Sequence, residues 1–556
     1  MKKSKYNVKW ILAHTRKCGL QMIVYAALTM FMPVIQLLFA YFMKMFIDIA
    51  VGNSDNSLLS VALYSITAII LGGAVMLINS VLAKSIYGIT ERELRTELMR
   101  VITTRKLLDI SKQHSGELMT KLTADVQAAS LCYPIIVENI IGGSVSALFS
   151  AAALFFLKWK IAVILLVLTP LMMFLMGMLT PQIQKISALD KANDETNRSI
   201  MQENLNRLTL IKAYSMQIKV VEKIERTYKN KLKSGMILGA WEGFAAFFGA
   251  LSGNVMSLVT LGLGSVFVLN GETTVGSLIM IVQLLNYIVT PVTKFPAAVA
   301  QIGQAAASAE RIGSIYELPE EQGNSSVSAN ADELIAENLC FSYSQENILN
   351  GIDMSFRKGE VTGIIGKSGS GKSTLLKLLM GLYSPTDGTV KLKCKDKTIS
   401  GEDIISQVAY VPPEDYLFSG TIAENIAMSD NERDTEKMSA AAASANIFDH
   451  IQSLANGFET VIGEGGNTVS SGQAQRIAIA RAIYKCGEIF IFDEPTANLD
   501  QETVDVFQST VKKLAQDNIC IIVTHDTSTV GICDKVYTLE NGRAQITALT
   551  AGKISL

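Results

Sequence analysis

GKSGSGKST, residues 366–374, is the stretch that decides the fold of the half of the chain in which it lies. It follows an apolar run with strand character, Val361 to Ile365, and it precedes a helical run, Leu375 to Met380. A plain Gly/Ser-rich turn would not need a lysine and a serine at these places, whereas a phosphate-binding loop between a strand and a helix needs both. The sequence therefore predicts that a nucleotide binds here.

Each residue type in the loop has a predicted task. The glycines let backbone N–H groups turn toward phosphate oxygens, and the following helix directs its positive end at the same anion. Lys372 can reach the β- and γ-phosphates, and the hydroxyl of Ser373 suits Mg²⁺. The predicted ATP-binding residues of the loop are Gly366, Lys367, Ser368, Gly369, Ser370, Gly371, Lys372, Ser373 and Thr374.

A second stretch, from Glu488 to Glu494, predicts a buried strand whose end delivers two carboxylates. Asp493 would hold Mg²⁺, directly or through water, and Glu494 would position and deprotonate the attacking water. Buried strands often end in acidic turns, so this stretch alone is weak evidence. Together with the phosphate-binding loop it predicts ATP hydrolysis with Mg²⁺.

The composition divides the chain into two large parts. Of its 556 residues, 49% are hydrophobic and 18% are charged, and the mean hydropathy is +0.30. Long apolar runs fill the chain before about residue 315, whereas the part after about residue 330 has the composition of a soluble domain. The net charge of −2 does not indicate a nucleic-acid partner. The seven cysteines are scattered without a CxxC pair, which predicts reduced thiols and no zinc site.

The first part predicts a helical membrane domain over residues 1–318. Its first apolar segment follows a basic N-terminus and is far longer than a signal-peptide core, so we expect a retained membrane helix. No peptidase-like segment precedes it, so we expect no built-in leader-peptide protease. Six spans are predicted, at about residues 20–50, 58–82, 131–157, 161–180, 244–269 and 275–300.

The loops between the spans predict the orientation. The long segments from Lys84 to Lys121 and from Lys185 to Lys233 are basic, whereas the opposite loops are short. The positive-inside rule places the long segments and both termini in the cytoplasm. Their helical periodicity predicts that the membrane helices continue into the cytosol.

A polar run predicts a linker over residues 319–332, followed by a soluble domain over residues 333–556. Helical segments separate its predicted strands, which favours a mainly parallel sheet with helices on both faces. The predicted strands are Leu334–Phe341, Val361–Ile365, Val408–Val411, Ile489–Phe492 and Cys520–Val523.

With these motifs in order, the chain resembles the ATP-binding cassette (ABC) transporters. VSSGQAQR, residues 469–476, is similar to the signature motif of that family, and residues 498–500 are similar to its D-loop. His525 matches the switch histidine, and Tyr343 falls where the family stacks an aromatic ring on adenine. Residues 463–465 resemble a loop found in exporters. The resemblance implies an α/β P-loop domain with an inserted helical subdomain.

The resemblance extends to the membrane half and identifies an exporter-type half-transporter. Its first cytoplasmic loop is similar to residues 115–126, its second coupling region to residues 211–214, and the end of its sixth helix to residues 308–312. In this family two chains bury two ATP molecules between them, and coupling regions transmit the closure. These regions would here lie near residues 112–116 and 207–214.

The signature residues would contact the ATP held by the other chain. The predicted partner contacts are Ser470, Ser471, Gly472, Gln473 and Asp500. The resemblance gives the catalytic roles on this chain to Glu494, His525 and Lys372, and the Mg²⁺ roles to Ser373 and Asp493.

Two departures from the family pattern bear on this assignment. Ser471 replaces a glycine where backbone and phosphate approach closely. Pro413 occupies the position of a glutamine that normally contacts Mg²⁺ and water, and proline has neither a side-chain donor nor an N–H group. Gln407 lies too early to replace it. We therefore hypothesise a heterodimer with one weakened ATP site, and a homodimer with tolerated substitutions is the alternative.

The predicted function is ATP-driven export of an amphipathic small molecule, lipid or peptide by alternating access, in the bacterial cytoplasmic membrane. An importer on the exporter fold and a membrane-bound ATP-binding regulator without transport are the alternatives. Phe244, Phe247 and Phe248 are interpreted as packing. Polar residues in the spans could line a substrate path or join helices, and Glu138 is the strongest candidate for the path. They are Gln36, Asn79, Glu138, Asn139, Asn254, Gln283 and Asn286.

Overall fold

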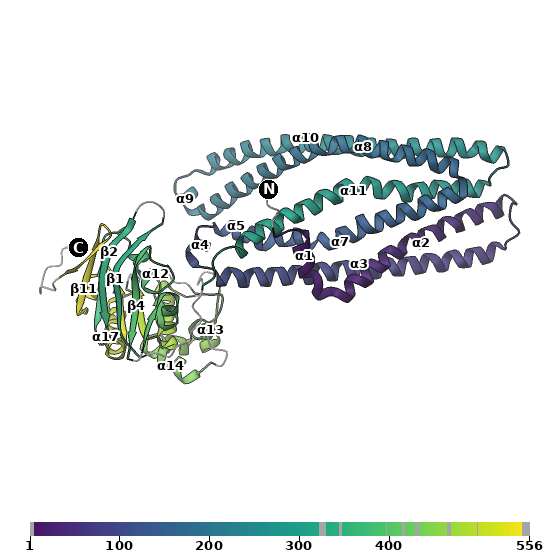
Figure 1. Ribbon diagram of the computed structural model, residues 1–556. Helices are drawn as coiled ribbons and strands as arrows, with labels where there is room; N and C mark the ends of the chain where they lie inside the picture. The colour runs from purple at the N-terminus through teal and green to yellow at the C-terminus, as the bar shows by residue number, and fades with distance from the viewer. Residues whose placement is uncertain are drawn as a thin grey trace. The chain divides into compact units, whose positions relative to one another are not determined.

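The computed structural model describes most of the chain. The described residues are 5–321, 330–343, 347–395, 397–413, 417–428, 433–463, 469–496 and 499–547, without the side chains of residues 165, 166, 169–173, 175 and 176. The chain forms two compact units, one helical and one α/β (Figure 1). The helical unit comprises Met1–Thr103 and His114–Glu317, and the α/β unit comprises Thr104–Gln113 and Leu318–Leu556.

Long helices build the first unit. Helices α8 and α10 run side by side, and α11 packs on both α8 and α2 (Figure 1). The main helices are α1 (Val8–His14), α2 (Gly19–Ala50), α3 (Leu58–Thr104), α8 (Gly143–Asn206), α9 (Leu208–Ala213), α10 (Gln217–Leu269) and α11 (Val275–Tyr316). Between α3 and α8 the chain continues through short helical segments, among them α5 (Ser115–Thr120) and α6 (Val126–Ser130).

Among the described residues, five helices are long and apolar enough to cross a membrane. They are Val8–Ala50, Leu58–Thr104, Ser115–Ile164, Gln217–Leu269 and Val275–Tyr316. The sixth predicted span, residues 161–180, follows a break in α8, where Lys158 has a non-helical backbone (φ −153°, ψ 91°). Several of its side chains lie outside the described set, so that span stays a prediction.

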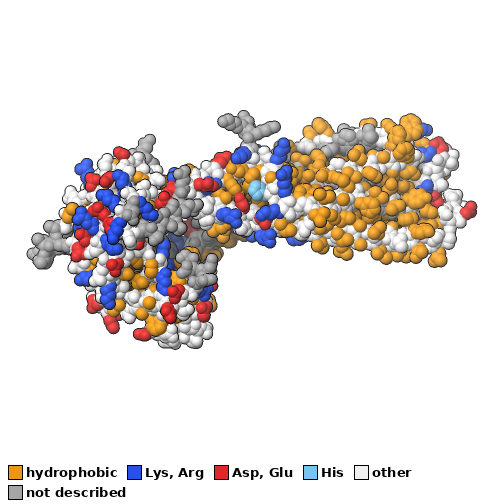
Figure 2. All heavy atoms as spheres, turned by 60° about the horizontal axis from the view of Figure 1, so that its bottom comes forward, with side chains coloured by type: hydrophobic (Ala, Val, Ile, Leu, Met, Phe, Trp, Pro, Cys, Tyr) orange, Lys and Arg blue, Asp and Glu red, His pale blue; other side chains and the backbone are white. Residues whose placement is uncertain are grey.

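The surface of the helical unit is apolar over most of its length. Hydrophobic side chains cover it, and Lys and Arg side chains gather toward one end (Figure 2). Leu59 and Phe156 are 81% and 89% exposed. Such a surface would be unstable in water and is suited to a bilayer.

Two of the segments between α3 and α8 are π-helical: η2 (Lys121–Asp125) and η3 (Ile136–Gly142). In η2 the buried Asp125 carboxylate accepts hydrogen bonds from Ser308 Oγ (2.9 Å) and Arg311 Nε (2.9 Å) of α11. Two of the three membrane-half segments that carry the family resemblance, residues 115–126 and 308–312, therefore meet at this buried carboxylate.

A six-stranded sheet forms the centre of the α/β unit, with the order β12-β11-β3-β10-β9-β6. The five strands from β11 to β6 are parallel to their neighbours, and β12 is antiparallel to β11. The strands are β3 (Val361–Ile365), β6 (Val408–Val411), β9 (Ile489–Asp493), β10 (Ile519–Val523), β11 (Lys535–Glu540) and β12 (Arg543–Thr547).

One predicted strand was assigned to the wrong sheet. Residues 334–341 belong to β1 (Ala331–Ser342), in a separate four-stranded sheet with the order β2-β1-β4-β5. β1 pairs antiparallel with β2 and β4, so it belongs to an antiparallel sheet rather than to a parallel strand–helix–strand unit. The other strands of this sheet are β2 (Asn347–Arg357), β4 (Asp387–Cys394) and β5 (Thr398–Ser400).

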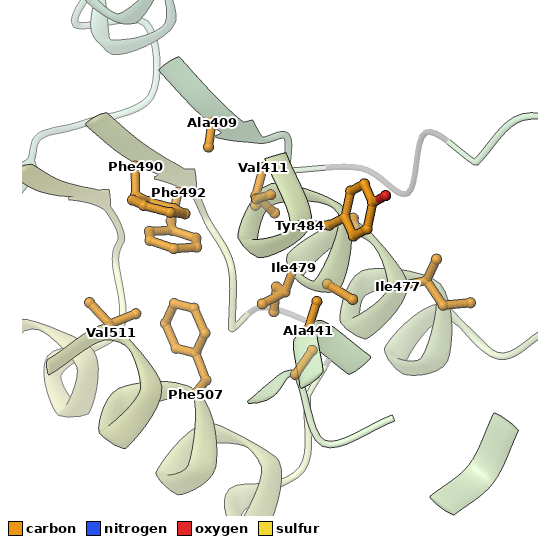
Figure 3. Packing of buried hydrophobic residues seen from close by; sticks show 14 of the residues in the cluster. Ala409, Val411, Ala441, Ile477, Ile479, Tyr484, Phe490, Phe492, Phe507 and Val511 are labelled. Carbon is orange, nitrogen blue, oxygen red and sulfur yellow. The ribbon is translucent and has the colours of Figure 1, made fainter. Parts of the chain in front are cut away.

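Alternating side chains of the parallel strands enter two different cores. Ile489 and Ile491 of β9 pack with β1, β2 and α12 (Lys372–Leu379), whereas Phe490 and Phe492 pack with the helices of the opposite face. Figure 3 shows these two phenylalanines facing Phe507 of α17 (Gln501–Asp517). Helices therefore lie on both faces, as expected, and the face that α12 covers is also covered by the antiparallel sheet, which was not predicted.

The predicted helical subdomain lies between β6 and the signature helix α16 (Ser471–Lys485). Its helices are α13 (Ile422–Ile426), α14 (Thr435–Ser444) and α15 (Phe448–Ser453). Apolar side chains of all three enter the core that also holds α16. This subdomain is therefore packed continuously with the sheet.

A short segment that interrupts the helical unit belongs to the α/β unit. Lys106 Nζ lies 2.8 Å from Glu402 Oε1, and the following α4 (Leu107–Ser111) packs Leu107 and Leu108 against the core beneath the antiparallel sheet. The first coupling region was predicted a few residues later, at 112–116. The coupling role of residues 112–116 stays a prediction.

Candidate functional site

Backbone conformation fixes the phosphate-binding loop between β3 and α12. Gly369 and Gly371 have φ values of 82° and 99°, which favour glycine. A Cβ on Gly371 would lie 3.0 Å from the Leu349 side chain, and one on Gly366 would lie 2.5 Å from Leu539 O. The glycines are therefore needed for both the turn and the close packing.

The Lys372 side chain folds back over its own loop. Its Nζ donates to Gly366 O (2.6 Å) and to Lys367 O (3.2 Å). Burial lowers the pKa of Lys372, and the Glu494 and Asp493 carboxylates oppose that shift. A positive group held in a loop of N–H donors is suited to a triphosphate.

Two carboxylates stand at the end of β9. Asp493 is buried, and burial raises its pKa, with a further increase from Glu494. Glu494 takes a left-handed backbone conformation (φ 50°), and its N–H donates to Val523 O at 2.8 Å. The non-glycine residue at positive φ redirects the chain out of the strand, a feature common at functional sites.

His525 joins this group from the neighbouring strand. Val523 of β10 lies opposite Asp493 in the parallel register, so His525 follows at the same edge of the sheet. Its Nε2 lies 3.4 Å from Glu494 Oε1. The register therefore brings together the predicted catalytic residues of three strands, since Lys372 follows β3.

Tyr410 is a member of this site that the sequence did not reveal. Its hydroxyl donates to Asp493 Oδ2 at 3.4 Å from the adjacent strand β6. Three residues on, Pro413 is partly buried in the connection after β6, and it offers no side-chain donor there. Residues 414–416, which follow Pro413, lie outside the described residues.

Tyr343 stands beside the end of the loop. Its hydroxyl lies 3.1 Å from Thr374 Oγ1, and its ring meets Phe341 edge-on at 5.1 Å. Tyr343 is 46% exposed, which leaves ring surface for another group. Its stacking on adenine stays a prediction.

The signature residues begin helix α16. Ser470 caps the helix, accepting from the Gln473 N–H, while the Gln473 side chain accepts from the Ser470 N–H. Ser471 is exposed at the first helical position, with Gly472 after it. The chain thus presents a capped, uncrowded helix start, suited to an anion.

Gln475 ties this helix to the catalytic turn. Its buried side-chain amide donates to Pro495 O at 2.5 Å, with Glu494 O at 3.4 Å. The sequence did not single it out, although its spacing of two from Gln473 places it on the inner face of α16. Asp500 occupies the residue position just before α17, whereas Asn498 and residues 464–465 lie outside the described residues.

The donors present fit Mg²⁺ and ATP. Ser373 is the second residue of α12, and Asp493 supplies a carboxylate at the end of β9. This pair suits an ion that takes few protein ligands and completes its shell with phosphates and water. Within the described residues, no hydrogen bond or ion pair joins Ser470, Ser471 or Asp500 to the side chain of Lys372 or Glu494.

The polar residues predicted in the spans separate into two groups. Four of them, Gln36, Asn79, Glu138 and Asn139, line a cavity of about 540 Å³ within the helical unit. The other three are not among the described lining residues: Asn254, Gln283 and Asn286.

Comparisons with known proteins agree with this architecture. The family model of the ABC transporter transmembrane region matches residues 22–292, and that of the ABC transporter matches residues 349–497. Leukotoxin translocation ATP-binding protein LktB of Mannheimia haemolytica is 31% identical over 356 residues, covering 63% of this chain and 50% of LktB. LktB of Mannheimia glucosida is 30% identical over the same coverage. The chain thus spans about half the length of the curated relatives it matches.

A solved structure extends the likeness in fold to nearly the whole chain. A bacterial Atm1-family ABC exporter with ATP bound superposes with a TM-score of 0.81, covering 95% of this chain and 94% of the other. The sequence identity is 21%, so this likeness concerns the fold alone.

Proposed function

The chain belongs to the ABC transporter family, with its membrane and ATP-binding domains fused, and on this premise we propose that it is a half-transporter that hydrolyses ATP to export an amphipathic molecule. The observation that supports hydrolysis is the meeting of Lys372, Asp493, Glu494 and His525 at one edge of the parallel sheet. A chain that only bound ATP would not need a carboxylate and an imidazole in contact.

The proposed chemistry assigns one task to each group. Lys372 balances charge on the phosphates, and Mg²⁺, when bound by Ser373 and Asp493, neutralises further phosphate charge. Glu494 accepts a proton from the attacking water, and His525 orients that carboxylate. The signature residues Ser470 to Gln473 would complete the site of the second chain, since a helix N-terminus favours anions.

The names of similar proteins favour export over import. The curated relatives are named for leukotoxin translocation, and the solved neighbour is named as an exporter. ATP-dependent uptake into inverted membrane vesicles tests the direction, because export from a cell becomes uptake there. Uptake into right-side-out vesicles instead would support an importer, and ATP hydrolysis without transport in either would support a regulator.

We also propose that the working unit contains two different chains. The VSSGQ signature carries Ser471 in place of glycine, which would weaken the ATP site completed for the partner. The cytoplasmic tip around α9 supports pairing, because apolar side chains such as Leu210 (53%) and Tyr214 (73%) are exposed in the single chain.

Subunit analysis tests the heterodimer. Isolation through an affinity tag on this chain, from its native membrane, is expected to recover a second half-transporter in equal amount by quantitative mass spectrometry. The chain expressed alone is expected to hydrolyse ATP at least about tenfold more slowly than the complex of both chains. Its ATP site would then lack the signature surface of the second half-transporter. Recovery of this chain alone, with full activity, would contradict the heterodimer.

Pro413 gives a second prediction about hydrolysis. Pro413→Gln is expected to raise ATP turnover about three- to tenfold, because the amide can contact Mg²⁺ and water where proline offers nothing, and one such polar contact corresponds to roughly 1 kcal/mol. Pro412→Gln, the same change one residue earlier, is the control. Phosphate release measures both, and an unchanged or lower rate in Pro413→Gln would show that the position is irrelevant.

A further inference from the structure

The cavity in the helical unit has the size and lining of a ligand site. Its volume of about 540 Å³ lies within the range that holds drug-sized molecules. Residues from α2, α3, η3, α8 and α11 line it, and Met32, Met76 and Tyr287 give it apolar and aromatic wall surface. An apolar wall of this kind suits a ligand with an apolar body.

Two opposite charges also line the cavity. Glu138 comes from η3 and Lys294 from α11. In the described part of the chain, no hydrogen bond or ion pair holds either side chain to another residue. A charge at membrane depth is costly and is usually paired or functional, so two unused charges in one cavity point to a ligand.

Two neutral amides of the same wall, Gln36 and Asn79, are already hydrogen-bonded to other helices. Gln36 Oε1 accepts a hydrogen bond from Ser146 Oγ at 2.9 Å, and Asn79 Nδ2 donates to Thr29 Oγ1 at 3.0 Å. These amides join helices to one another. Together with Asn139, the two charges are therefore polar groups of the wall that remain for a bound molecule.

Backbone features shape the wall around Glu138. The π-helical turns of η3 carry Glu138 and Asn139, and π-helical turns frequently occur at functional sites because they redirect side chains. At the end of η3, a Cβ on Gly142 would lie 2.5 Å from the Thr29 side chain, and one on Gly143 would lie 3.0 Å from Pro291. Two glycines thus let this wall close against α2 and α11.

We infer that the cavity binds an amphipathic zwitterion, with its cationic group at Glu138, its anionic group at Lys294 and its apolar body against the wall. A neutral apolar ligand would leave both charges unpaired, and a singly charged ligand would leave one. The inference names a substrate class for the proposed exporter and rests on that function only for the transport step, since binding itself requires no ATP.

Three matched peptides test the inference. Leucyl-phenylalanyl-leucine with free termini is zwitterionic, its N-acetyl form is anionic and its C-terminal amide is cationic. Each is labelled and measured by equilibrium dialysis against the purified transporter in lipid nanodiscs, without nucleotide. The free peptide is expected to bind about tenfold more tightly than either blocked form, as charge-assisted contacts allow.

Two variants assign the charges. Glu138→Gln is expected to weaken binding of the free peptide and the amide about tenfold and to leave the N-acetyl form unchanged. Lys294→Gln is expected to weaken binding of the free peptide and the N-acetyl form and to leave the amide unchanged. Glu225→Gln, an exposed change on α10 outside the cavity, is the control. Size-exclusion chromatography verifies that each variant is folded.

Equal affinity of the wild type for all three peptides would overturn the inference. So would variants that weaken all three peptides equally, since that result would mean that Glu138 and Lys294 only support the helices. If ATP hydrolysis remains normal while the peptides fail to bind, the inference alone fails. If the crossed binding pattern appears but ATP drives no transport, the proposed function fails and the binding site stands.

Discussion

Lys372→Met is expected to reduce ATP hydrolysis by at least about 100-fold in kcat/KM, the order expected for loss of one preorganised electrostatic group. The Lys372 ammonium lies within 2.6–3.2 Å of two loop carbonyls, and its pKa is lowered by burial. This partly buried cation, which donates to carbonyls of its own loop, is held where phosphate charge would replace the carbonyl contacts. Methionine keeps the length and removes the charge.

The control for this change lies on the same helix. Lys377 Nζ lies 5.2 Å from the centre of the Tyr383 ring. Lys377→Met is expected to change kcat/KM less than about threefold, because it removes only a weak cation–π contact. Phosphate release and the binding of a fluorescent ATP analogue measure both variants. Similar losses in the two variants would mean that helix stability, and not phosphate contact, explains the result.

Glu494→Gln is expected to lower kcat by about 100- to 10,000-fold while ATP binding is kept, the range for loss of a general base. The amide can still accept a hydrogen bond from His525, 3.4 Å away, but it cannot take a proton from water. Glutamine also fits the left-handed backbone as well as glutamate does, so the fold should be retained.

Bound nucleotide separates this effect from a general loss of function. The Glu494→Gln transporter is expected to retain ATP, and not ADP, after rapid gel filtration. Glu502→Gln, in the first turn of α17, is the control and is expected to behave as the wild type. A Glu494→Gln variant that turned over ATP within tenfold of the wild type would assign the proton transfer to another group.

The buried parallel strands could be predicted closely from the sequence. The bounds of β3 and β6 agree with the prediction, because a strand buried on both faces is a continuous apolar run that ends in turn residues. β2, β4, β11 and β12 were omitted from the predicted strands. Half-exposed strands such as β2, which includes Gly351, give a weaker pattern.

The pairing of strands and their register could not be predicted from the sequence. The prediction of the fold and that of the site were both incomplete for this reason. Residues 334–341 have the same local pattern in either sheet, so only the hairpin partner decides where they lie. The contact of Tyr410 with Asp493 depends on the register of β6 with β9, which no local signal encodes. The π-helical segment that presents Glu138 has no sequence signature.

The motif residues themselves were predictable because spacing carries their chemistry. Asp493 ends the buried strand β9, and Lys372 follows the loop after the buried strand β3. Parallel strands bring such ends to one edge of the sheet. The contact of Gln475 with Pro495 could not be predicted, because it joins two motifs that lie 20 residues apart in the sequence. Sequence spacing therefore predicts which residues belong to the site, and the contacts between distant motifs come only from the structure.

The measurement that tests ATP-driven export most directly compares the contents of inverted membrane vesicles. Vesicles with the wild-type transporter, and others with Glu494→Gln, are incubated with a cell extract with or without ATP, and their contents are compared by mass spectrometry. If the chain is an ATP-driven exporter, at least one amphipathic compound is expected to accumulate only with ATP and only in wild-type vesicles. Identical contents in both preparations, while the wild type hydrolyses ATP, would contradict ATP-driven export.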